Sequence, residues 1–375
     1  MKRVLIIGNS HDKHLSRFIK GLRSLDVDYA IDILDVSMRQ DLCESNSLYD
    51  RVCISKRTHP DFIYKIPFLN KLCKYRDTVL AFKNIVKDYS LISVQFITIQ
   101  AGFLYSSLKK NGAKLIVTPW GSDIYRIGAF QRNFTRKLLA EADFVTLMPS
   151  SKFGDDVKRE YQLAESICLP LCFGSDILDA IFKDSKSRAD CKKQLLGSAD
   201  KFTITIGYNA SSAQNHLQVI EAISNIKNIL PSNTILLLPM TYSKVESYMD
   251  EVRFALDELG VEYRIFDKYL SDEEVLDLRK GTDLFIHMQK TDAYSSSLQE
   301  ALLSKSKVIN ADWLRYKELE MDGLPYYLAN FNNLTSVISQ ALTDSCRPID
   351  ITDALRCYTW TYQLAEWNKL YKQYC

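Results

Sequence analysis

Short apolar runs alternate with amphipathic stretches along most of this chain. The run Arg3 to Ile7 ends at Gly8, and the stretch from His11 to Arg23 repeats apolar residues at the spacing of one helical face. Further strand-like runs occur at 29–36, 91–97, 114–118, 144–148, 167–173, 202–206, 263–266, 283–288 and 308–309. Helix-like segments at 101–110, at 217–226 and after 295 separate several of them. This alternation predicts an α/β protein with parallel sheets.

Polar residues follow the first predicted strand, where a parallel sheet binds its ligands. Ligands of such sheets lie beyond the carboxyl ends of the strands, which brings Asn9, His11 and Asp12 near a predicted cleft. His11 with Asp12 is the best candidate pair for acid–base work, and a structural or solvent-facing role is the alternative for each. The loop has no G-x-G-x-x-G pattern, so a dinucleotide fingerprint is not predicted.

The stretch Asp292-Ala-Tyr-Ser-Ser-Ser-Leu-Gln-Glu300 lies between a buried apolar run and a partly apolar helix. Ser295, Ser296 and Ser297 therefore stand where a strand leads into a helix. A serine can cap such a helix, and the free N–H groups of its first turn attract phosphate. Glu300, about one turn into the helix, can reach back toward a ligand held there. A solvated Asp292 and a surface Glu300 are the alternative.

Another polar loop follows the predicted strand 202–206. It opens at Gly207, contains Asn209 and ends at His216, where the next helix begins. Uncharged donors at a helix start bind phosphate through N–H dipoles, so His216 is a candidate phosphate contact. A surface helix cap is the alternative for this histidine.

The turn Pro119-Trp-Gly-Ser-Asp123 follows the strand predicted at 114–118. Trp120 can stack on a sugar face or on a lipid. Asp123 is a candidate base or a ligand for a sugar hydroxyl, with capping of the following helix as the alternative. After the strand at 263–266, Ser271 and Glu274 form a capping box, which fixes the start of another helix.

Residues 51–90 interrupt the alternation with a basic and apolar segment. The basic residues are Arg51, Lys56, Arg57, Lys65, Lys71, Lys74, Arg76, Lys83 and Lys87, and they alternate with Phe62, Tyr64, Ile66, Phe68, Leu69, Leu72 and Tyr75. Such a segment can lie on an anionic membrane surface or hold the phosphates of an acceptor. An amphipathic helical insertion with a solvated basic face is the alternative.

Composition narrows the class of protein. A chain of 375 residues is long enough for two domains, and its 46% hydrophobic and 25% charged residues are typical of a soluble globular protein. The net charge of +2 gives no argument for nucleic acid as a partner. Nine cysteines without CxxC spacing indicate free thiols in a reducing cytoplasm. No apolar run reaches the roughly 20 residues that span a bilayer, and the apolar part of the N-terminus is too short for a signal peptide.

The stretch 292–300 resembles the E-x7-E signature of the GT-B glycosyltransferases of retaining family 4, Glu-x-Phe-Gly-x-x-x-x-Glu. Asp292 stands at the first Glu, Tyr294 at the Phe and Ser295 at the Gly. The turn 119–123 is similar to the His-Gly-Ser-Asp strand end of that family, with Trp120 in place of the His. Gly174-Ser175-Asp176 resembles the Asn-Gly-Val-Asp turn that leaves the N-terminal domain.

The loop 207–216 departs from family 4, which carries an Arg and a Lys there to neutralise the donor diphosphate. Its Gly-x-Asn-x-Ser…Asn-His pattern is closer to the fucosaminyl (4-acetamido-fucose) transferases of enterobacterial common antigen, which are also GT-B enzymes. Lys268, Lys290 and Arg264 are the candidates to replace the missing cations.

The resemblance implies two Rossmann-like domains that face a central cleft. We expect an acceptor-binding domain at 1–175, completed by a C-terminal helix at 355–375, and a donor-binding domain at 200–354, with a loop-like linker around 183–193. In the donor domain the resemblance implies that Asp292 contacts the sugar, Glu300 the ribose, and Lys268 with Tyr269 the base. Gly207, Asn209, His216, Tyr294, Ser295, Ser296 and Ser297 complete the predicted donor site. Asn9, Asp12 and Trp120 form the predicted acceptor site, with Asp123 or His11 nearest the chemistry.

The sequence thus predicts a glycosyltransferase that moves a sugar from a nucleotide-sugar to a glycan or lipid-linked acceptor, in bacterial surface polysaccharide synthesis. No cofactor or metal is expected, because helix ends and cations can stabilise the leaving diphosphate. We expect a cytoplasmic protein at the inner face of the membrane. A non-catalytic nucleotide- or sugar-binding protein and a GT-B nucleotide-sugar epimerase are the alternatives.

Overall fold

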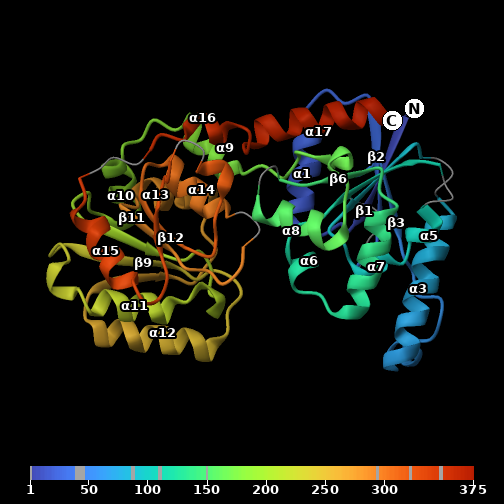
Figure 1. Cartoon of the computed structure of the whole chain (residues 1–375). Helices are drawn as coiled ribbons and strands as arrows, with labels where there is room; N and C mark the ends of the chain where they lie inside the picture. Colours follow the sequence, from blue (N-terminus) through green and yellow to red (C-terminus); the bar gives the residue numbers. More distant parts are fainter. Residues whose placement is uncertain are drawn as a thin grey trace. The chain divides into compact units, whose positions relative to one another are not determined.

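The protein consists of two compact units, each built on one parallel sheet (Figure 1). The computed structural model describes residues 2–38, 47–85, 89–108, 112–148, 151–292, 295–320, 323–345 and 349–375. The first unit comprises Met1–Gly174 and Trp360–Cys375, and the second comprises Ser175–Thr359. The second unit therefore begins well before residue 200, where the sequence placed the start of the donor domain.

The first unit contains a seven-stranded sheet with the order β3-β2-β1-β4-β5-β6-β7. Its strands are β1 (Lys2–Gly8), β2 (Tyr29–Asp35), β3 (Arg51–Ile54), β4 (Leu91–Gln95), β5 (Lys114–Thr118), β6 (Phe144–Thr146) and β7 (Cys168–Leu169). Its helices are α1 (Lys13–Arg23), α2 (Asp61–Tyr64), α3 (Pro67–Lys83), α4 (Ile99–Gly102), α5 (Tyr105–Leu108), α6 (Ser122–Tyr125), α7 (Ala129–Ala140), α8 (Lys152–Tyr161) and α17 (Trp360–Tyr374). Strands β2 and β4 are buried along their whole length, as is typical of a parallel sheet covered on both faces, and they include the buried polar residues Asp32, Asp35, Ser93 and Gln95.

Helix α17 completes the core of the first unit. It packs on α1 (Figure 1). Phe18 of α1 lies among the rings of Trp360, Trp367 and Tyr371. Its polar atoms are also paired, since Trp367 Nε1 donates to Cys172 O at 3.0 Å and Tyr371 Oη to Ser93 Oγ at 2.9 Å. Apolar burial and paired polar tips together hold this distant segment on the first sheet.

The second unit contains a six-stranded sheet with the order β10-β9-β8-β11-β12-β13. Its strands are β8 (Phe202–Ile206), β9 (Thr234–Pro239), β10 (Glu262–Phe266), β11 (Leu284–His287), β12 (Lys307–Ala311) and β13 (Tyr327–Ala329). Its helices are α9 (Asp176–Lys183), α10 (Arg188–Leu196), α11 (His216–Ser224), α12 (Glu246–Leu259), α13 (Asp272–Gly281), α14 (Ser296–Leu303), α15 (Leu334–Thr343) and α16 (Thr352–Arg356). Helices α10, α13 and α14 cover one face of this sheet and α11 and α12 the other (Figure 1).

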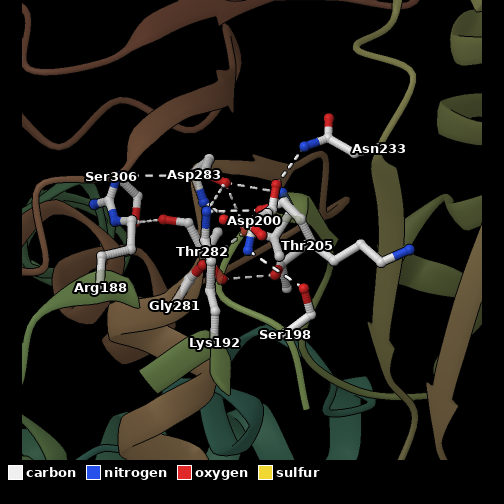
Figure 2. A network of polar contacts seen from close by, with 12 residues as sticks. Arg188, Lys192, Ser198, Asp200, Thr205, Asn233, Gly281, Thr282, Asp283 and Ser306 are labelled. Carbon is white, nitrogen blue, oxygen red and sulfur yellow. Dashed lines mark hydrogen bonds and ion pairs between the residues drawn. The ribbon is translucent and has the colours of Figure 1, made fainter. Parts of the chain in front are cut away.

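A partly buried network around Asp283 attaches α10 to the amino end of β11 (Figure 2). The carboxylate accepts from Lys192 Nζ at 2.5 Å and from Thr203 N at 2.8 Å, and it pairs with Arg188 at 3.5 Å. The Ser187 capping box starts this helix. The expected loop-like linker at 183–193 was therefore wrong, because basic residues of this stretch pair with buried acids instead of facing water.

Two other sequence expectations differ from the structure. The single helix expected at 101–110 is replaced by the short helices α4 and α5, and residues 109–111 lie outside the described part of the chain. The strand expected at 167–173 is only the two residues of β7. None of the helices in the described ranges combines the length and the hydropathy needed to cross a bilayer.

Replacing Asp283 with Asn should destabilise the second unit by about 3 kcal/mol, because it leaves Lys192 buried without its counter-charge. The matched control is Glu262→Gln, which breaks the exposed Lys201–Glu262 pair and should change stability by less than about 0.5 kcal/mol. Urea unfolding followed by circular dichroism measures both. Equal effects of the two substitutions would contradict a structural role for the Asp283 network.

Candidate functional site

The strand order of each sheet reverses next to its first strand. In the second unit the chain continues from β8 to β9 on one side and returns to β11 on the other. Open parallel sheets bind ligands at such switch points, outside the carboxyl ends of the strands. In the second unit this place is formed by the loop after β8, residues 207–216, and by the described residues of the loop after β11, 288–292 and 295.

Gly207 makes the sharp turn out of β8. Its φ of +63° lies in the left-handed region, and a Cβ added here would lie 2.9 Å from Gln214 Oε1 and 3.1 Å from His216 Nε2. Only glycine satisfies both constraints without rearrangement. The predicted donor-site residue Gly207 thus brings the following loop back against the strand end.

Hydrogen bonds join the two loops at the switch point. Asn215 Nδ2 donates to Met288 O at 2.6 Å, Gln214 Nε2 to Gln289 Oε1 at 2.7 Å, and Lys290 N to Ala213 O at 2.9 Å. The loops are therefore fixed relative to one another before any ligand binds. Asn209 is buried in the same loop, and its Oδ1 accepts from Ser211 N at 2.8 Å.

His216 is buried at the start of α11. The alternative interpretation of His216 as a surface helix cap is therefore wrong. Its Nδ1 lies 3.1 Å from Tyr248 Oη, and its Nε2 has no hydrogen-bond partner in the described part of the chain. Burial lowers the pKa of His216 to about 4, so the imidazole is neutral at neutral pH. A phosphate contact by His216 remains a prediction, and it would use Nε2 as a neutral donor.

Asp292 lies among aromatic and imidazole groups. Its Oδ2 accepts from Tyr208 Oη at 3.0 Å and lies 3.6 Å from Nε2 of the buried His287. The rings of Tyr208 and His287 stack with centroids 5.9 Å apart. Burial is the main reason why the pKa of Tyr208 is raised, and the negative charge of Asp292 raises it further. The phenol therefore stays protonated and donates to the carboxylate. These contacts fix the orientation of a carboxylate that is still partly exposed.

The first turn of α14 carries the predicted serines and Glu300. Ser295 caps the helix, accepting from Leu298 N at 3.3 Å, Ser296 is exposed and Ser297 is buried. Glu300 is buried too: its Oε2 accepts from Arg279 Nε at 2.8 Å and its Oε1 from Ser175 Oγ at 2.9 Å. A surface position for Glu300 is thereby excluded. The predicted contact Tyr294 lies outside the described residues.

Arg279 is the residue of this site that sequence reasoning missed. It comes from α13, and its Nη2 also donates to Ser297 Oγ at 2.7 Å. Of the cations that the sequence proposed, Arg264 donates to Leu195 O at 2.7 Å, Lys268 is exposed after β10, and Lys290 is exposed in the loop after β11. Tyr269, beside Lys268, is 69% exposed after β10. Its predicted contact with a base remains a prediction.

In the first unit, Asp123 links the loops after β4 and β5. Its oxygens accept three backbone N–H groups, from Ile97, Trp120 and Gly121, each at 2.8 Å. The side chain is buried, and burial raises its pKa although these hydrogen bonds oppose the shift. The structure therefore gives Asp123 a role in fixing the loop, and its predicted role in catalysis is not tested.

The other predicted acceptor-site residues lie at the same edge of the first sheet. Asp12 caps α1, accepting from His14 N at 2.9 Å and Leu15 N at 3.0 Å, and His11 is exposed beside it. Asn9 Oδ1 accepts from His11 N at 3.1 Å. Trp120 packs edge-on against His14, Phe96 and Phe173. Much of the Trp120 ring is thus already covered within the unit.

No protein-family model and no curated protein matches this sequence. Solved structures do match over the full chain. Sucrose-phosphate synthase from Thermosynechococcus elongatus aligns with a TM-score of 0.70 and 14% identity, covering 100% of this chain and 99% of that chain. HepE of Anabaena in complex with UDP aligns with a TM-score of 0.68 and 14% identity, covering 100% of both chains. A glycosyltransferase from Rickettsia africae aligns with a TM-score of 0.69 and 15% identity, covering 99% of this chain and 98% of that one.

These likenesses show that the chain has the GT-B fold. At such identities they carry no further conclusion about activity. Membership of retaining family 4 and kinship with the fucosaminyl transferases stay predictions.

Acid should destabilise the second unit through His216. Because its folded-state pKa of about 4 lies below the ordinary 6.5, the unfolded chain takes up a proton first as the pH falls. The stability is fully present above pH 6.5 and is lost toward pH 4, with a loss of about 2 kcal/mol between pH 7 and pH 5. Urea unfolding at both values should show this loss in the native chain and a smaller one in His216→Gln. Equal losses of stability in the native chain and in His216→Gln would show that His216 is not the source of the acid effect.

Proposed function

We propose that this protein is a glycosyltransferase that moves a sugar from a nucleotide-sugar to a hydroxyl group of a glycan or lipid-linked acceptor. The observation that carries the proposal is the switch point of the second unit, where a capped helix start, a buried arginine and an oriented carboxylate come together. The GT-B fold supports it, as do related structures of HepE with UDP and UDP-glucose.

In the proposed reaction the acceptor oxygen bonds to C1 of the donor sugar as the bond from C1 to the diphosphate breaks. The acceptor proton passes to a base, and the nucleoside diphosphate leaves. The N–H groups of Ser296 and Ser297 at the start of α14 stabilise the leaving phosphates, Asp292 contacts the sugar and Glu300 the ribose. No metal is needed in this proposal, because the helix start and a cation take up the developing charge.

The acceptor is proposed to bind the first unit near Asn9, Asp12 and Trp120. Of the two candidate bases, the contacts favour His11. Its imidazole is exposed, whereas the oxygens of Asp123 already accept three backbone N–H groups. A neutral histidine is a suitable base at neutral pH.

A contact with an anionic membrane is proposed for α2 and α3. Helix α3 buries the polar Asp77 and Thr78, whereas Phe68 is 71% and Leu72 51% exposed. Phe62 on α2 is 65% exposed. Exposed basic residues flank these apolar side chains: Lys65, Lys71, Arg76 and Lys83. Apolar side chains with a basic rim suit an interface with anionic lipids, so we propose a cytoplasmic enzyme that reaches lipid-linked intermediates of surface polysaccharides at the membrane.

Two rival functions remain, and each predicts a different fate of the nucleotide-sugar. A non-catalytic binding protein would bind the nucleotide-sugar without turnover. An epimerase would convert one nucleotide-sugar into another without an acceptor. The oriented Asp292 beside the helix start favours transfer, because it places a carboxylate where a donor sugar follows its diphosphate.

One of the UDP-, GDP- or dTDP-sugars should raise the melting temperature of the protein, since a ligand that binds only the folded state stabilises it. With membranes as acceptor source, label from that donor should enter a lipid-linked or glycan product. Glu300→Ala should weaken donor binding and turnover together by at least about tenfold, because a charge-assisted contact is lost. Glu262→Ala, on the exposed end of β10, is the control. Binding without transfer would favour the non-catalytic rival, and no binding of any donor would exclude both.

The double substitution Phe62→Ser and Phe68→Ser should lower binding to vesicles that contain phosphatidylglycerol by at least about tenfold, because two large apolar side chains no longer enter the interface. Phe254→Ser removes an equally exposed phenylalanine, at 68%, from the second unit and serves as the control. Sedimentation with vesicles measures the bound fraction. Unchanged binding of the double variant would remove the membrane proposal.

A further inference from the structure

The loop after β8, at the phosphate end of the proposed donor site, has no cation of its own, and Lys290 of the loop after β11 is exposed. Residues 207–216, which follow β8, contain no lysine or arginine. The diphosphate of a nucleotide-sugar carries two negative charges, whereas a helix start supplies about half a positive charge. A donor that binds here therefore needs a positive group from another element.

Arg279 is such a group at the start of α14. The side chain uses one edge of its guanidinium, donating through Nε to Glu300 and through Nη2 to Ser297, and the residue is only 7% exposed. The guanidinium also lies over the Phe285 ring, 5.9 Å from its centroid, and the remaining nitrogen, Nη1, has no hydrogen-bond partner among the residues that the structure describes. Buried donors are almost always paired, so an open, charged N–H group at this depth indicates a missing acceptor.

The charge of Arg279 also acts on the loop after β9. Tyr242 in that loop is 41% exposed, and its partial burial raises its pKa, whereas a hydrogen bond with Asn209 and the Arg279 charge both oppose this rise. Arg279 is therefore close enough to influence a hydroxyl group that itself contacts the loop after β8. The contacts of the guanidinium place it at the start of α14, beside Ser297 and Glu300.

We propose that Arg279 receives the diphosphate of the donor through Nη1, and that Glu300 holds the guanidinium in place while it contacts the ribose. This assignment rests on the proposed function of the second unit. It has a consequence that a purely structural ion pair lacks. Glu300 reduces the positive charge that a phosphate meets, so removing the Arg279 charge and removing the Glu300 charge should change phosphate affinity in opposite directions.

Inorganic pyrophosphate tests this directly, because its binding does not depend on the base or the sugar. Calorimetry should show that Arg279→Gln weakens pyrophosphate binding at least tenfold and that Glu300→Gln strengthens it severalfold. Arg279→Lys, which keeps the charge, should retain part of the affinity. Arg264→Gln removes an arginine that donates to Leu195 O, and it should change the pyrophosphate affinity by less than twofold.

The double variant Arg279→Gln with Glu300→Gln separates binding from folding, because it leaves no unpaired buried charge. We expect it to fold and to bind pyrophosphate as weakly as Arg279→Gln, with a reduced dependence on salt. Three results would overturn the assignment of Arg279 to the diphosphate. The first is native pyrophosphate affinity in the double variant, and the second is weaker pyrophosphate binding in both Arg279→Gln and Glu300→Gln. The third is that the native chain does not bind pyrophosphate. If the double variant transferred sugar from a nucleotide-sugar at the native rate, the assignment of Arg279 to the diphosphate would be overturned. The proposed glycosyltransferase function would not be affected by that result. Pyrophosphate binding through Arg279 without binding of any nucleotide-sugar would refute only the proposed function.

Discussion

The buried ion pair between Arg279 and Glu300 is the contact on which the proposed site depends. It joins α13 to α14, and Ser175 extends it to the segment that leads into α9. A buried charge pair costs desolvation energy, so it persists only where hydrogen bonds satisfy both partners. Here both carboxylate oxygens accept a hydrogen bond, whereas Nη1 of the guanidinium has no hydrogen-bond acceptor among the described residues. The same pair that orders the helix start therefore also presents a positive group to it.

The topology of the second sheet determines where this pair acts. Because β8 and β11 are adjacent and parallel, the loops that follow them meet at one edge. Gly207 turns the first loop back, and the amide groups of Gln214 and Asn215 tie it to the second. At the opposite edge, the Asp283 network attaches α10 and so fixes the start of the strand that carries the site (Figure 2). Polar contacts at both ends of β11 thus fix this strand relative to α10 and to the loop after β8.

Much of this could be predicted from the sequence, and the exceptions have physical causes. The strands at 114–118 and 202–206 were predicted with their observed bounds, because isolated apolar runs between turn residues have few alternatives. Helix α10 was missed because its basic residues suggested solvent, although the Ser187 and Asp190 capping box was a local signal. The placement of Glu300 near a helix start was readable from spacing. Its pairing with Arg279, 21 residues earlier, depends on the packing of two helices, and no local pattern records it.

The central claim is that a nucleotide-sugar binds at the edge of the second sheet where the loops after β8 and β11 meet. Hydrogen–deuterium exchange with a saturating nucleotide-sugar tests it most directly, because exchange reports each segment in the intact chain. The account predicts slower exchange in 207–216 and 295–303, with little change at the opposite edge around Asp283. Protection confined to the first unit, or an exchange pattern that no nucleotide-sugar alters, would contradict it.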